Sequence, residues 1–570
     1  MIAFLSLLFP AADVQASSVW HPVTVSFRGP DTSEDADPNP FVEHELTVLF
    51  SRGESRFEVP GYFAADGDAA ETGATAGHVW RAHFCPPAAG EWRYEATLAG
   101  GELTDPSGTF SVSEATDGDG FYSSGPIVVD ATVQRYRLAG TGDVWLKAGA
   151  DSPENLLGYV DFDGTYRHDK ENRRTGDTPL STDVLHRYEP HARDARDGDP
   201  TWRGGRGANL LGALNYLSEQ GMNSVYFLTM NVTGDGKDVW PWTSHEERAR
   251  FDCSKLDQWN RVFTHMQRRG LAMHVVLQET ENDHLLDGGD LGPERRRYLR
   301  ELVARFAHHP GLVWNLGEEN TQTPAQVAAM AESLRALDPY DHPIKMHTYP
   351  NKMEEGYRPL LGTATLTGVS LQVGKPSNTY RQTRQWLSES RESGRPWTAE
   401  LDEIGPADTG VRPDADDPDH DMVRRDVLWP HLMAGGSGCE WYFGYRFADH
   451  DLTAEDWRSR DEMWRQTRVA MNFFRGLPLA EMRRTAATAD ESVLTFAKPG
   501  EVYVLYMKDA SKPATLDLSE ADGKFTVRWV DAKSGDEPDE GFVRSVDGGD
   551  TIELRPPQRH GDWACVVTRP

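Results

Sequence analysis

The segment Leu312-Val313-Trp314-Asn315-Leu316 decides the fold, because it is an apolar strand candidate between two amphipathic helical segments. The helix before it is predicted to begin at Pro293, where the missing N–H of proline costs nothing. The helix after it runs from Ala325 to Leu337. Strands that are buried on both faces and separated by helices are typical of parallel β/α folds. The segment therefore predicts one βα unit of a parallel sheet.

The same pattern repeats between residues 121 and 480. The strand candidates are Val144–Gly149, Ser224–Leu228, Ala272–Leu277, Leu312–Leu316, Ile344–His347, Gly368–Gln372, Trp397–Leu401 and Gly438–Phe443. Helical segments separate most of them, and eight such units predict a closed (β/α)8 barrel. An open doubly wound sheet is the alternative, but no GxGxxG or P-loop string follows a strand to support it.

The residues on both sides of the barrel segment have the pattern of antiparallel β-structure. Short alternating runs such as Glu45–Phe50, broken by Gly, Pro and Asp, fill residues 20–113. Similar runs, such as Glu501–Met507, fill residues 483–570. Runs of period two between turn residues are typical of β-sandwiches. We therefore expect an N-terminal and a C-terminal β-sandwich around the barrel.

Composition excludes several classes of protein. The chain has 570 residues and a formal net charge of −31, which argues against a nucleic-acid partner because phosphate contacts need clustered Lys and Arg. No stretch approaches ~18 consecutive apolar residues, so no membrane span is expected. The four cysteines have no CxxC spacing and indicate neither a disulfide framework nor a zinc site. The 17 Trp residues offer flat platforms that suit sugar rings, although core packing is their more common role.

Residues 1–16 are expected to be a signal peptide. Ile2–Phe9 is a short apolar run, and Val14-Gln15-Ala16 places small residues where a signal peptidase would cut. The run has no basic residues before it, so a simple apolar N-terminus is the alternative. We predict a secreted or periplasmic protein.

Carboxylates at strand ends are the first candidates for chemistry, because barrel active sites lie at the C-terminal ends of the strands. Glu318 and Glu319 follow the fourth strand, and Glu400 and Glu403 belong to the seventh. Glycosidic cleavage usually uses two carboxylates, one to protonate the leaving oxygen and one to attack or to activate water. A lone glutamate after a strand is more often a helix cap or a surface charge, whereas two at these positions favour catalysis.

Two of these segments carry a resemblance to a known group. Trp314-Asn315-Leu316-Gly317-Glu318-Glu319 resembles the W-x-L-G-N-E motif of clan A glycoside hydrolases, and Glu403-Ile404-Gly405 resembles their nucleophile motif, often E-Y-G or E-F-G. Gly149–Asn155 and Glu279–Asp283 are similar to a less characterised branch, which has an N-terminal sandwich of unassigned function and a C-terminal domain of a collagen-binding type. The resemblance implies a retaining O-glycosidase without cofactor or metal, with Glu319 as acid/base and Glu403 as nucleophile.

The chain departs from the clan pattern at Glu318, where the clan usually has an Asn that contacts the sugar 2-hydroxyl. Glu318 would serve there as an acceptor, and adjacent carboxylates also raise one another's pKa, which helps a general acid keep its proton. On the seventh strand Glu400 competes with Glu403 as nucleophile. An extended strand would point these two to opposite faces, so only one should face the pocket. We favour Glu403.

Further side chains after strands are candidate substrate-binding residues, each with a structural role as the alternative. With Glu318 they are Asp151, Glu154, Glu279, Asn282, Asn320, His347, Tyr349, Gln372 and Trp441. Four arginines in the barrel segment (Arg203, Arg206, Arg381 and Arg384) suggest an anionic polysaccharide as one form of the carbohydrate substrate. His245-Glu246-Glu247 is not an HExxH motif, so zinc protease chemistry has no support. The rival function is a non-catalytic carbohydrate-binding or scaffolding protein on a degenerate barrel.

Overall fold

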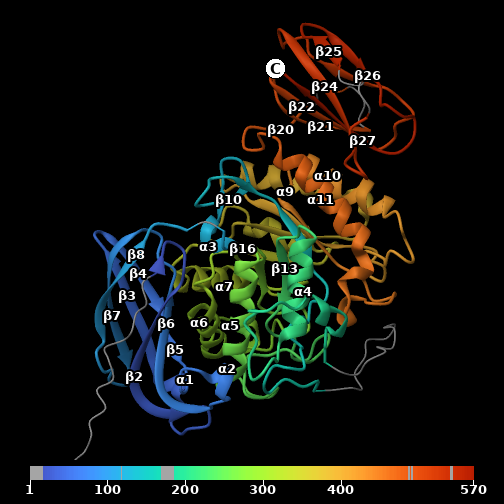
Figure 1. Cartoon of the computed structure of the whole chain (residues 1–570). Helices are drawn as coiled ribbons and strands as arrows, with labels where there is room; N and C mark the ends of the chain where they lie inside the picture. The colour runs from blue at the N-terminus through green and yellow to red at the C-terminus, as the bar shows by residue number, and fades with distance from the viewer. Residues whose placement is uncertain (1–16, 117, 169–184, 486–487, 489–491, 539–543) are drawn as a thin grey trace, which may run out of the picture.

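The computed structural model of the protein describes residues 17–116, 118–168, 185–485, 488, 492–538 and 544–570. The expected signal peptide, residues 1–16, lies outside the described residues. An N-terminal β-domain, a central barrel and a C-terminal β-domain follow one another along the chain, and the two β-domains lie against different sides of the barrel (Figure 1). This arrangement confirms the predicted fold class.

The central body is a closed barrel of parallel strands that follow chain order. Its strands are β12 (Lys147–Ala150), β13 (Ser224–Leu228), β14 (Ala272–Val276), β15 (Leu312–Asn315), β16 (Ile344–Thr348), β17 (Gly368–Val373), β18 (Thr398–Ile404) and β19 (Gly438–Trp441). Pairing of β19 with β12 closes the ring. The first predicted run is divided, because its beginning forms β11 (Val144–Trp145), which pairs outside the barrel with β10 (Arg135–Leu138) beside β9 (Ile127–Asp130).

Helices surround the barrel strands. They are α4 (Ala208–Glu219), α5 (Cys253–Arg268), α6 (Pro293–Phe306), α7 (Pro324–Leu337), α8 (Met353–Tyr357), α9 (Thr379–Glu392), α10 (Trp429–Ala434) and α11 (Asp461–Arg475). The start of α7 is encoded locally, since Thr323 and Gln326 form a reciprocal capping box. Within the described part of the chain, no helix combines the length and the apolar character that crossing a bilayer requires.

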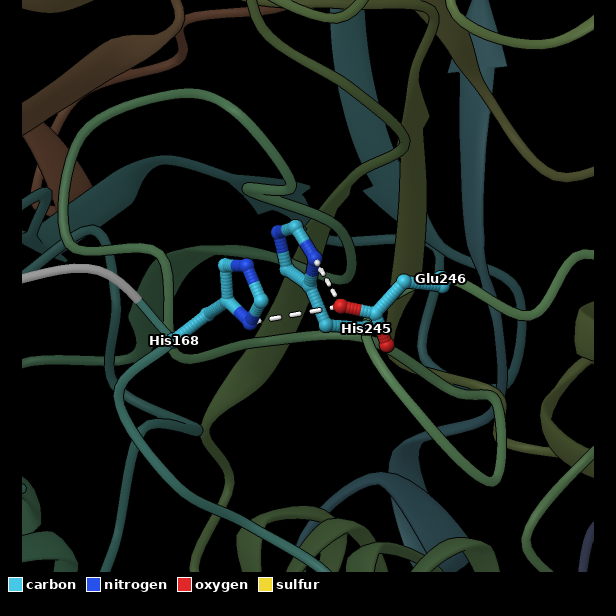
Figure 2. A group of neighbouring side chains, drawn as sticks. All are labelled: His168, His245 and Glu246. Atoms are coloured by element: carbon cyan, nitrogen blue, oxygen red, sulfur yellow. Dashed lines mark ion pairs between the residues drawn. The ribbon is translucent and has the colours of Figure 1, made fainter.

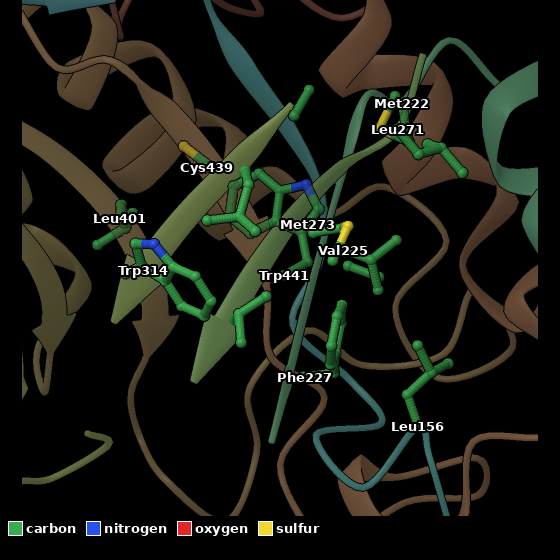
Figure 3. Packing of buried hydrophobic residues seen from close by; sticks show 14 of the residues in the cluster. Leu156, Met222, Val225, Phe227, Leu271, Met273, Trp314, Leu401, Cys439 and Trp441 are labelled. Atoms are coloured by element: carbon green, nitrogen blue, oxygen red, sulfur yellow. The ribbon is translucent and has the colours of Figure 1, made fainter. Parts of the chain in front are cut away.

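Side chains on the outer face of the strands pack between the barrel and its helices. Trp314 of β15 and both Cys439 and Trp441 of β19 are fully buried in this layer (Figure 3). Trp314 Nε1 donates to Asp338 Oδ2 at 3.0 Å, and Trp441 Nε1 donates to Thr467 Oγ1 of α11 at 2.8 Å. Because successive strand residues alternate between faces, the neighbours of these residues point into the barrel.

Inside the barrel, four strands contribute a buried ion network of Lys147, Lys345, Glu400, Asp402 and Glu440. Each of these side chains is at most 1% exposed. Lys147 Nζ lies 2.9 Å from Glu440 Oε2 and 3.8 Å from Glu400 Oε2, and it also contacts Asp402 Oδ1. Lys345 Nζ lies 2.9 Å from Glu400 Oε1. The network therefore joins β12, β16, β18 and β19.

Opposite charges keep Lys147 and Glu440 ionised in spite of their burial, whereas burial still raises the pKa of Asp402. Burial by itself lowers the pKa of Lys147, but Asp402, Glu440 and Glu400 together hold that pKa above its ordinary range. Burial likewise raises the pKa of Glu440, yet Lys147 and His274 bring it down to about 2. A buried charge that loses its partner has neither water nor a counterion, so the lysine is indispensable to the carboxylates around it.

Lys147→Met is expected to lower the free energy of unfolding by about 3–5 kcal/mol, because the carboxylates would lose their central counterion. Denaturant unfolding at pH 7, followed by circular dichroism, measures this difference. Lys352→Met removes an exposed lysine and is the control, with an expected change within about 0.5 kcal/mol. Equal stability of the two variants would contradict the role given to Lys147.

The N-terminal domain is a β-sandwich that docks on α6. One sheet has the order β1 (Ser17–Ser18), β8 (Ser107–Ser113), β7 (Gly90–Ala99), β3 (Glu45–Arg52) and β4 (Ser55–Pro60). The other sheet has the order β2 (Val23–Ser33), β6 (Ala76–Phe84) and β5 (Tyr62–Phe63). The same part of the chain also forms the short helices α1 (Pro40–Glu43), α2 (Ala69–Thr72) and α3 (Phe121–Ser124). Arg305 of α6 donates through Nη2 to Phe63 O at 3.1 Å and stacks on Tyr62 at 4.0 Å from the ring centroid.

The C-terminal domain is also built from two sheets. The larger has the order β20 (Arg483–Arg484), β21 (Val493–Lys498), β22 (Val502–Met507), β27 (Trp563–Thr568), β24 (Lys524–Asp531) and β25 (Arg544–Asp547), and the smaller pairs β23 (Ala514–Asp517) with β26 (Thr551–Leu554). Arg424, in a π-helical turn before α10, lies 2.8 Å from Asp562 in an ion pair that is 1% exposed on both sides. Tyr506 donates to the same carboxylate at 2.8 Å, so a buried polar contact docks this domain.

Candidate active site

Glu319 and Glu403 lie at neighbouring positions of the barrel mouth. Glu319 follows β15 and is partly exposed, with φ +45° in the left-handed region that non-glycine residues rarely adopt. Glu403 is near the end of β18 and only 5% exposed. A non-glycine residue held in this strained conformation is often found at a functional site, because the surrounding structure must enforce it.

Gln372, at the end of β17, connects the two glutamates. Its Nε2 donates to Glu319 Oε1 at 2.8 Å. Its backbone is the register partner of Glu403 on β18, and its side chain lies within hydrogen-bonding reach of that carboxylate. The pair predicted from the sequence is therefore brought together around one amide.

His347 of β16 completes the immediate surroundings of Glu403. Its Nε2 lies 3.5 Å from Glu403 Oε2, and its Nδ1 lies 3.3 Å from the hydroxyl of Tyr226. Burial lowers the pKa of His347 to about 4, although Glu319 acts in the opposite direction. The imidazole is therefore neutral at pH 7 and contributes a hydrogen bond with Tyr226 rather than charge.

Glu400 and Glu403 differ in depth along the barrel and not in the face that they occupy, which corrects the alternation expected from the sequence. The register of β17 with β18 shifts between Leu371 and Gln372, so that Leu371 pairs with Leu401 but Gln372 pairs with Glu403. This bulge adds one residue and turns Glu403 inward. Burial alone would raise the pKa of Glu400, yet Lys345 and Lys147 hold it below its ordinary range. Glu400 is thus an internally paired carboxylate below the mouth.

Four further carboxylates crowd the mouth beside the pair, and we name them the acidic cluster: Asp151, Glu154, Glu318 and Asp451. Glu154 lies within hydrogen-bonding reach of the carboxyl groups of both Glu318 and Asp451. The Oε2 atom of Glu318 is buried and has no hydrogen-bond partner among the described residues. Asp451 accepts hydrogen bonds from Ser152 Oγ and from the backbone N–H of Glu154. No lysine or arginine in the described residues forms an ion pair with the cluster.

Burial and mutual repulsion raise the pKa values of these mouth carboxylates. Burial is the largest cause for Asp151, Glu154 and Glu318, whose pKa values lie well above the ordinary range, and neighbouring carboxylates add to it. Burial also raises the pKa of Asp451 to about 7, in spite of its hydrogen bonds. The pKa of Glu403 is also raised, mainly by burial and then by the charge of Glu319. Burial therefore raises the pKa of each member of the acidic cluster, whereas deeper in the barrel the lysines hold the pKa values of Glu400 and Glu440 below the ordinary range.

Other predicted substrate-binding residues have partners within the protein. Asn282 Nδ2 donates to Glu279 Oε1 at 3.0 Å, and Asn282 Oδ1 accepts from the Glu279 backbone. Asn320 Nδ2 donates to Gln322 Oε1 at 3.1 Å and so organises the turn after β15. Tyr349 is partly exposed directly after β16. These residues support the loops around the mouth.

Trp441 is not at the mouth, which corrects its proposed role beneath a sugar. It is fully buried between β19 and α11, because the neighbouring residue Glu440 takes the inward position. Asp451, conversely, was missed by the sequence reasoning. It lies in the short helical turn Asp451–Thr453, ten residues beyond the end of β19. Its only sequence signal is that it follows the eighth strand, which many surface acids also do.

The four arginines that suggested an anionic substrate do not lie among the carboxylates of the mouth: two pair with an aspartate and two are exposed on a helix. Arg203 Nη1 and Arg206 Nη1 both donate to Asp163 Oδ1, at 3.0 and 3.1 Å. Arg381 and Arg384 are exposed on α9, one of the helices that surround the barrel. None of the four belongs to the cluster of carboxylates at the mouth.

Comparison with known proteins bears on the N-terminal domain and on the fold. Residues 16–99 match a domain of unknown function, DUF5060, a segment that includes β1 to β7 of the N-terminal sandwich. The match agrees with the N-terminal domain of unassigned function that the sequence resemblance implies. A search of curated proteins finds no match to this chain.

Solved structures of glycoside hydrolases have a similar fold. A candidate glycoside hydrolase from Bacteroides vulgatus ATCC 8482 is 16% identical over 97% of this chain and 100% of its own, with a TM-score of 0.67. A family 5 glycoside hydrolase from the same organism is 15% identical over 78% of this chain and 94% of its own, with a TM-score of 0.53. A further glycoside hydrolase is 14% identical, with coverages of 78% and 97% and a TM-score of 0.54. At these identities the comparison establishes the shared fold.

Asp451→Asn is expected to stabilise the protein at pH 8 but not at pH 4. The folded-state pKa of about 7 exceeds the ordinary value of 3.8, so the folded protein binds the extra proton and its stability falls as pH rises between these values. The neutral amide removes that loss, which we expect to be worth about 1–3 kcal/mol. Unfolding free energies at both pH values measure it, with the exposed Asp197→Asn as control. The same difference at pH 4 and pH 8 would contradict the assignment.

Proposed function

We propose that this protein is a retaining glycoside hydrolase that cleaves O-glycosidic bonds of a polysaccharide or oligosaccharide. The observation that carries the proposal is the arrangement of Glu319 and Glu403 at the barrel mouth, joined through the amide of Gln372. Glu319 acts as acid/base and Glu403 as nucleophile, as the strand motifs imply. The shared fold with glycoside hydrolases supports this reaction class over other chemistry that a barrel can host.

The proposed mechanism needs one proton on the pair of glutamates. The acid/base donates it to the leaving oxygen while the nucleophile attacks as a carboxylate and forms a covalent glycosyl-enzyme, which water then hydrolyses. Burial and the charge of Glu319 raise the pKa of Glu403, which favours its protonated form, so the mechanism requires Glu403 to give up this proton before it attacks. Glu319 is the more exposed of the two, and in this role it carries the proton to the leaving group.

The acidic cluster argues for a substrate without negative charge near the reacting bond. A uronate or sulfate group placed beside Asp151, Glu154 and Glu318 would add a negative charge to carboxyl groups that already repel one another, and these groups would then have to stay protonated or bear further like-charge repulsion. Neutral sugars, or amino sugars whose ammonium group offsets the cluster, meet no such penalty. We therefore propose a neutral or cationic glycan rather than an anionic one.

Action outside the cytoplasm, as the N-terminal segment suggests, stays a prediction. The rival function is a non-catalytic carbohydrate-binding protein. The two functions differ in one observable: only a retaining enzyme forms a covalent intermediate. Incubation with 2-deoxy-2-fluoro glycosides, followed by mass spectrometry of the intact protein, tests this directly.

Glu319→Gln and Glu403→Gln are each expected to lower kcat/KM by about 10²-fold or more, because each removes one of two groups that act on the glycosidic bond. Reducing-end release from polysaccharide substrates measures this effect, and thermal unfolding verifies that the variants fold. Glu332→Gln, on the exposed face of α7, is the matched control and should keep full activity.

An aryl glycoside with a good leaving group distinguishes the two roles. Its departure needs no proton, so the Glu319 variant should lose much less activity on it than the Glu403 variant does. Full activity of either variant on polysaccharide would refute the role assigned to that residue.

Polysaccharides rich in uronate or sulfate are expected to be cleaved at least about tenfold more slowly than neutral or amino glycans, since tenfold corresponds to about 1.4 kcal/mol of like-charge repulsion. A panel of neutral plant glycans, chitosan, alginate and sulfated algal galactans, compared by reducing-end release, measures the preference. Glu318→Gln should narrow the gap between anionic and neutral substrates. A faster reaction on alginate than on every neutral or amino glycan would refute the proposed substrate charge.

A further inference from the structure

Three side chains converge at a second place on the C-terminal side of the barrel. His168 belongs to the connection after β12, whereas His245 and Glu246 belong to the connection between β13 and α5. Figure 2 shows both imidazoles directed at one carboxylate. The Nδ1 atoms of His168 and His245 each lie 3.4 Å from Glu246 Oε1, and the two rings stack with centroids 3.6 Å apart.

His245 is the central member of this group, and its nitrogens lack hydrogen bonds. The residue is 8% exposed, and neither Nδ1 nor Nε2 has a hydrogen-bond partner in the described structure. Buried imidazole nitrogens normally do have one, because an unsatisfied polar atom costs free energy. A ligand that accepts the Nδ1 lone pair of His245 would give that nitrogen a partner and remove its part of this cost.

The surroundings hold His245 in place before any ligand binds. Its backbone N–H donates to the hydroxyl of Tyr166 at 3.2 Å, and its carbonyl accepts from Arg248 Nη1 at 2.6 Å. The edge-to-face contact with Trp240, at 5.3 Å between ring centroids, fixes the orientation of the ring. A site whose central ligand is already oriented loses less entropy when the ligand binds.

The separations of Glu246 Oε1 from both histidines match the coordination of a small divalent metal ion, and the exposed His168 ring has to turn out of its parallel stack with His245 for both lone pairs to meet at one ion. Zinc binds imidazole nitrogen at about 2.0–2.1 Å and carboxylate oxygen at about 2.0–2.2 Å in tetrahedral geometry, so two of its ligand atoms lie roughly 3.4 Å apart. Glu246 Oε1 has this distance to both histidines, which is longer than a good hydrogen bond. All three ligand atoms lie within 4.8 Å of one another.

A second group of metal-ligating residues has a different explanation. His274, Asp402 and Glu440 also converge inside the barrel. The ammonium group of Lys147 already lies among them, 2.9 Å from Glu440 Oε2 and 3.2 Å from His274 Nδ1. A lysine thus supplies the positive charge there, whereas the described residues place no lysine Nζ or arginine nitrogen within ion-pairing distance of Glu246.

We propose that His168, His245 and Glu246 form a binding site for Zn²⁺ or a similar transition-metal ion. Two neutral imidazoles and one carboxylate suit zinc, copper or nickel and do not suit calcium or magnesium, which prefer oxygen ligands. The three protein ligands leave a fourth tetrahedral position for water. The bound ion joins the connection after β12 to the connection after β13, and it stabilises both beside the barrel mouth.

Metal binding by the full-length protein, without a polyhistidine tag and freed of metal with a chelator, tests the proposal. Titration calorimetry with ZnCl2 is expected to show one equivalent bound, and zinc should raise the unfolding temperature by roughly 2 °C or more. His168→Ala, His245→Ala and Glu246→Gln should each weaken binding at least about tenfold and abolish that rise. His560→Ala, which removes an exposed histidine of the C-terminal domain, is the control and should bind as the unchanged protein does.

Two of the variants keep the test independent of folding. The side chains of His168 and Glu246 are 37% and 65% exposed, so their replacement should leave the unfolding temperature without zinc unchanged, even if His245→Ala lowers it. Absence of zinc binding by the unchanged protein would overturn the proposal. Undiminished binding by the His168 and Glu246 variants would overturn it too, and so would an equal stabilisation by calcium.

Discussion

The ammonium group of Lys147 lies among Glu400, Asp402 and Glu440 in the interior of the barrel, and this contact governs how the barrel closes. Lys147 is on the first strand, while its partners are on the seventh and eighth. The ring of eight strands closes where the first and eighth pair, and the lysine lies across this seam. Because water is excluded there, any other register would leave several charges unpaired.

Carboxylates therefore have two roles, which depend on whether they lie deep inside the barrel (the lower layer) or at its mouth (the upper layer). In the lower layer lysines compensate the carboxylates, and the pKa of Glu440 falls to about 2. In the upper layer the described residues supply no such lysine, and the pKa of Asp451 rises to about 7. The lower layer provides rigidity, whereas the upper layer keeps repulsion that lowers stability. Natural active sites often retain such unfavourable interactions because the reaction needs them.

Local sequence patterns were sufficient for the fold and for the choice of a candidate pair at strand ends, because both depend on periodicity. Trp314 marks a strand whose end carries Glu319, and this needs only nearby residues. Two expectations were wrong, one because the structure departs from simple alternation and one because a distant partner decides which face of a strand points inward. The bulge before Gln372 turns Glu403 inward, and no residue type announces it. Trp441 faces outward because Glu440 is required by Lys147, a partner almost three hundred residues away. A β-bulge or an ion pair between strands far apart in the sequence can be recognised only once the structure shows which strands are neighbours.

Glu318 shows how these layers affect the proposed chemistry. A neutral amide at this position would have left the mouth with fewer like charges, whereas the carboxylate lies within hydrogen-bonding reach of Glu154 and has one oxygen without a partner. Without substrate, the oxygens of these carboxylates find hydrogen-bond donors only if the carboxyl groups share protons. A donor on a bound substrate is the alternative. A sugar hydroxyl or ammonium group supplies such a donor. Binding of the correct substrate would therefore relieve repulsion among these carboxylates, so recognition and the protonation state of Glu403 become coupled through them.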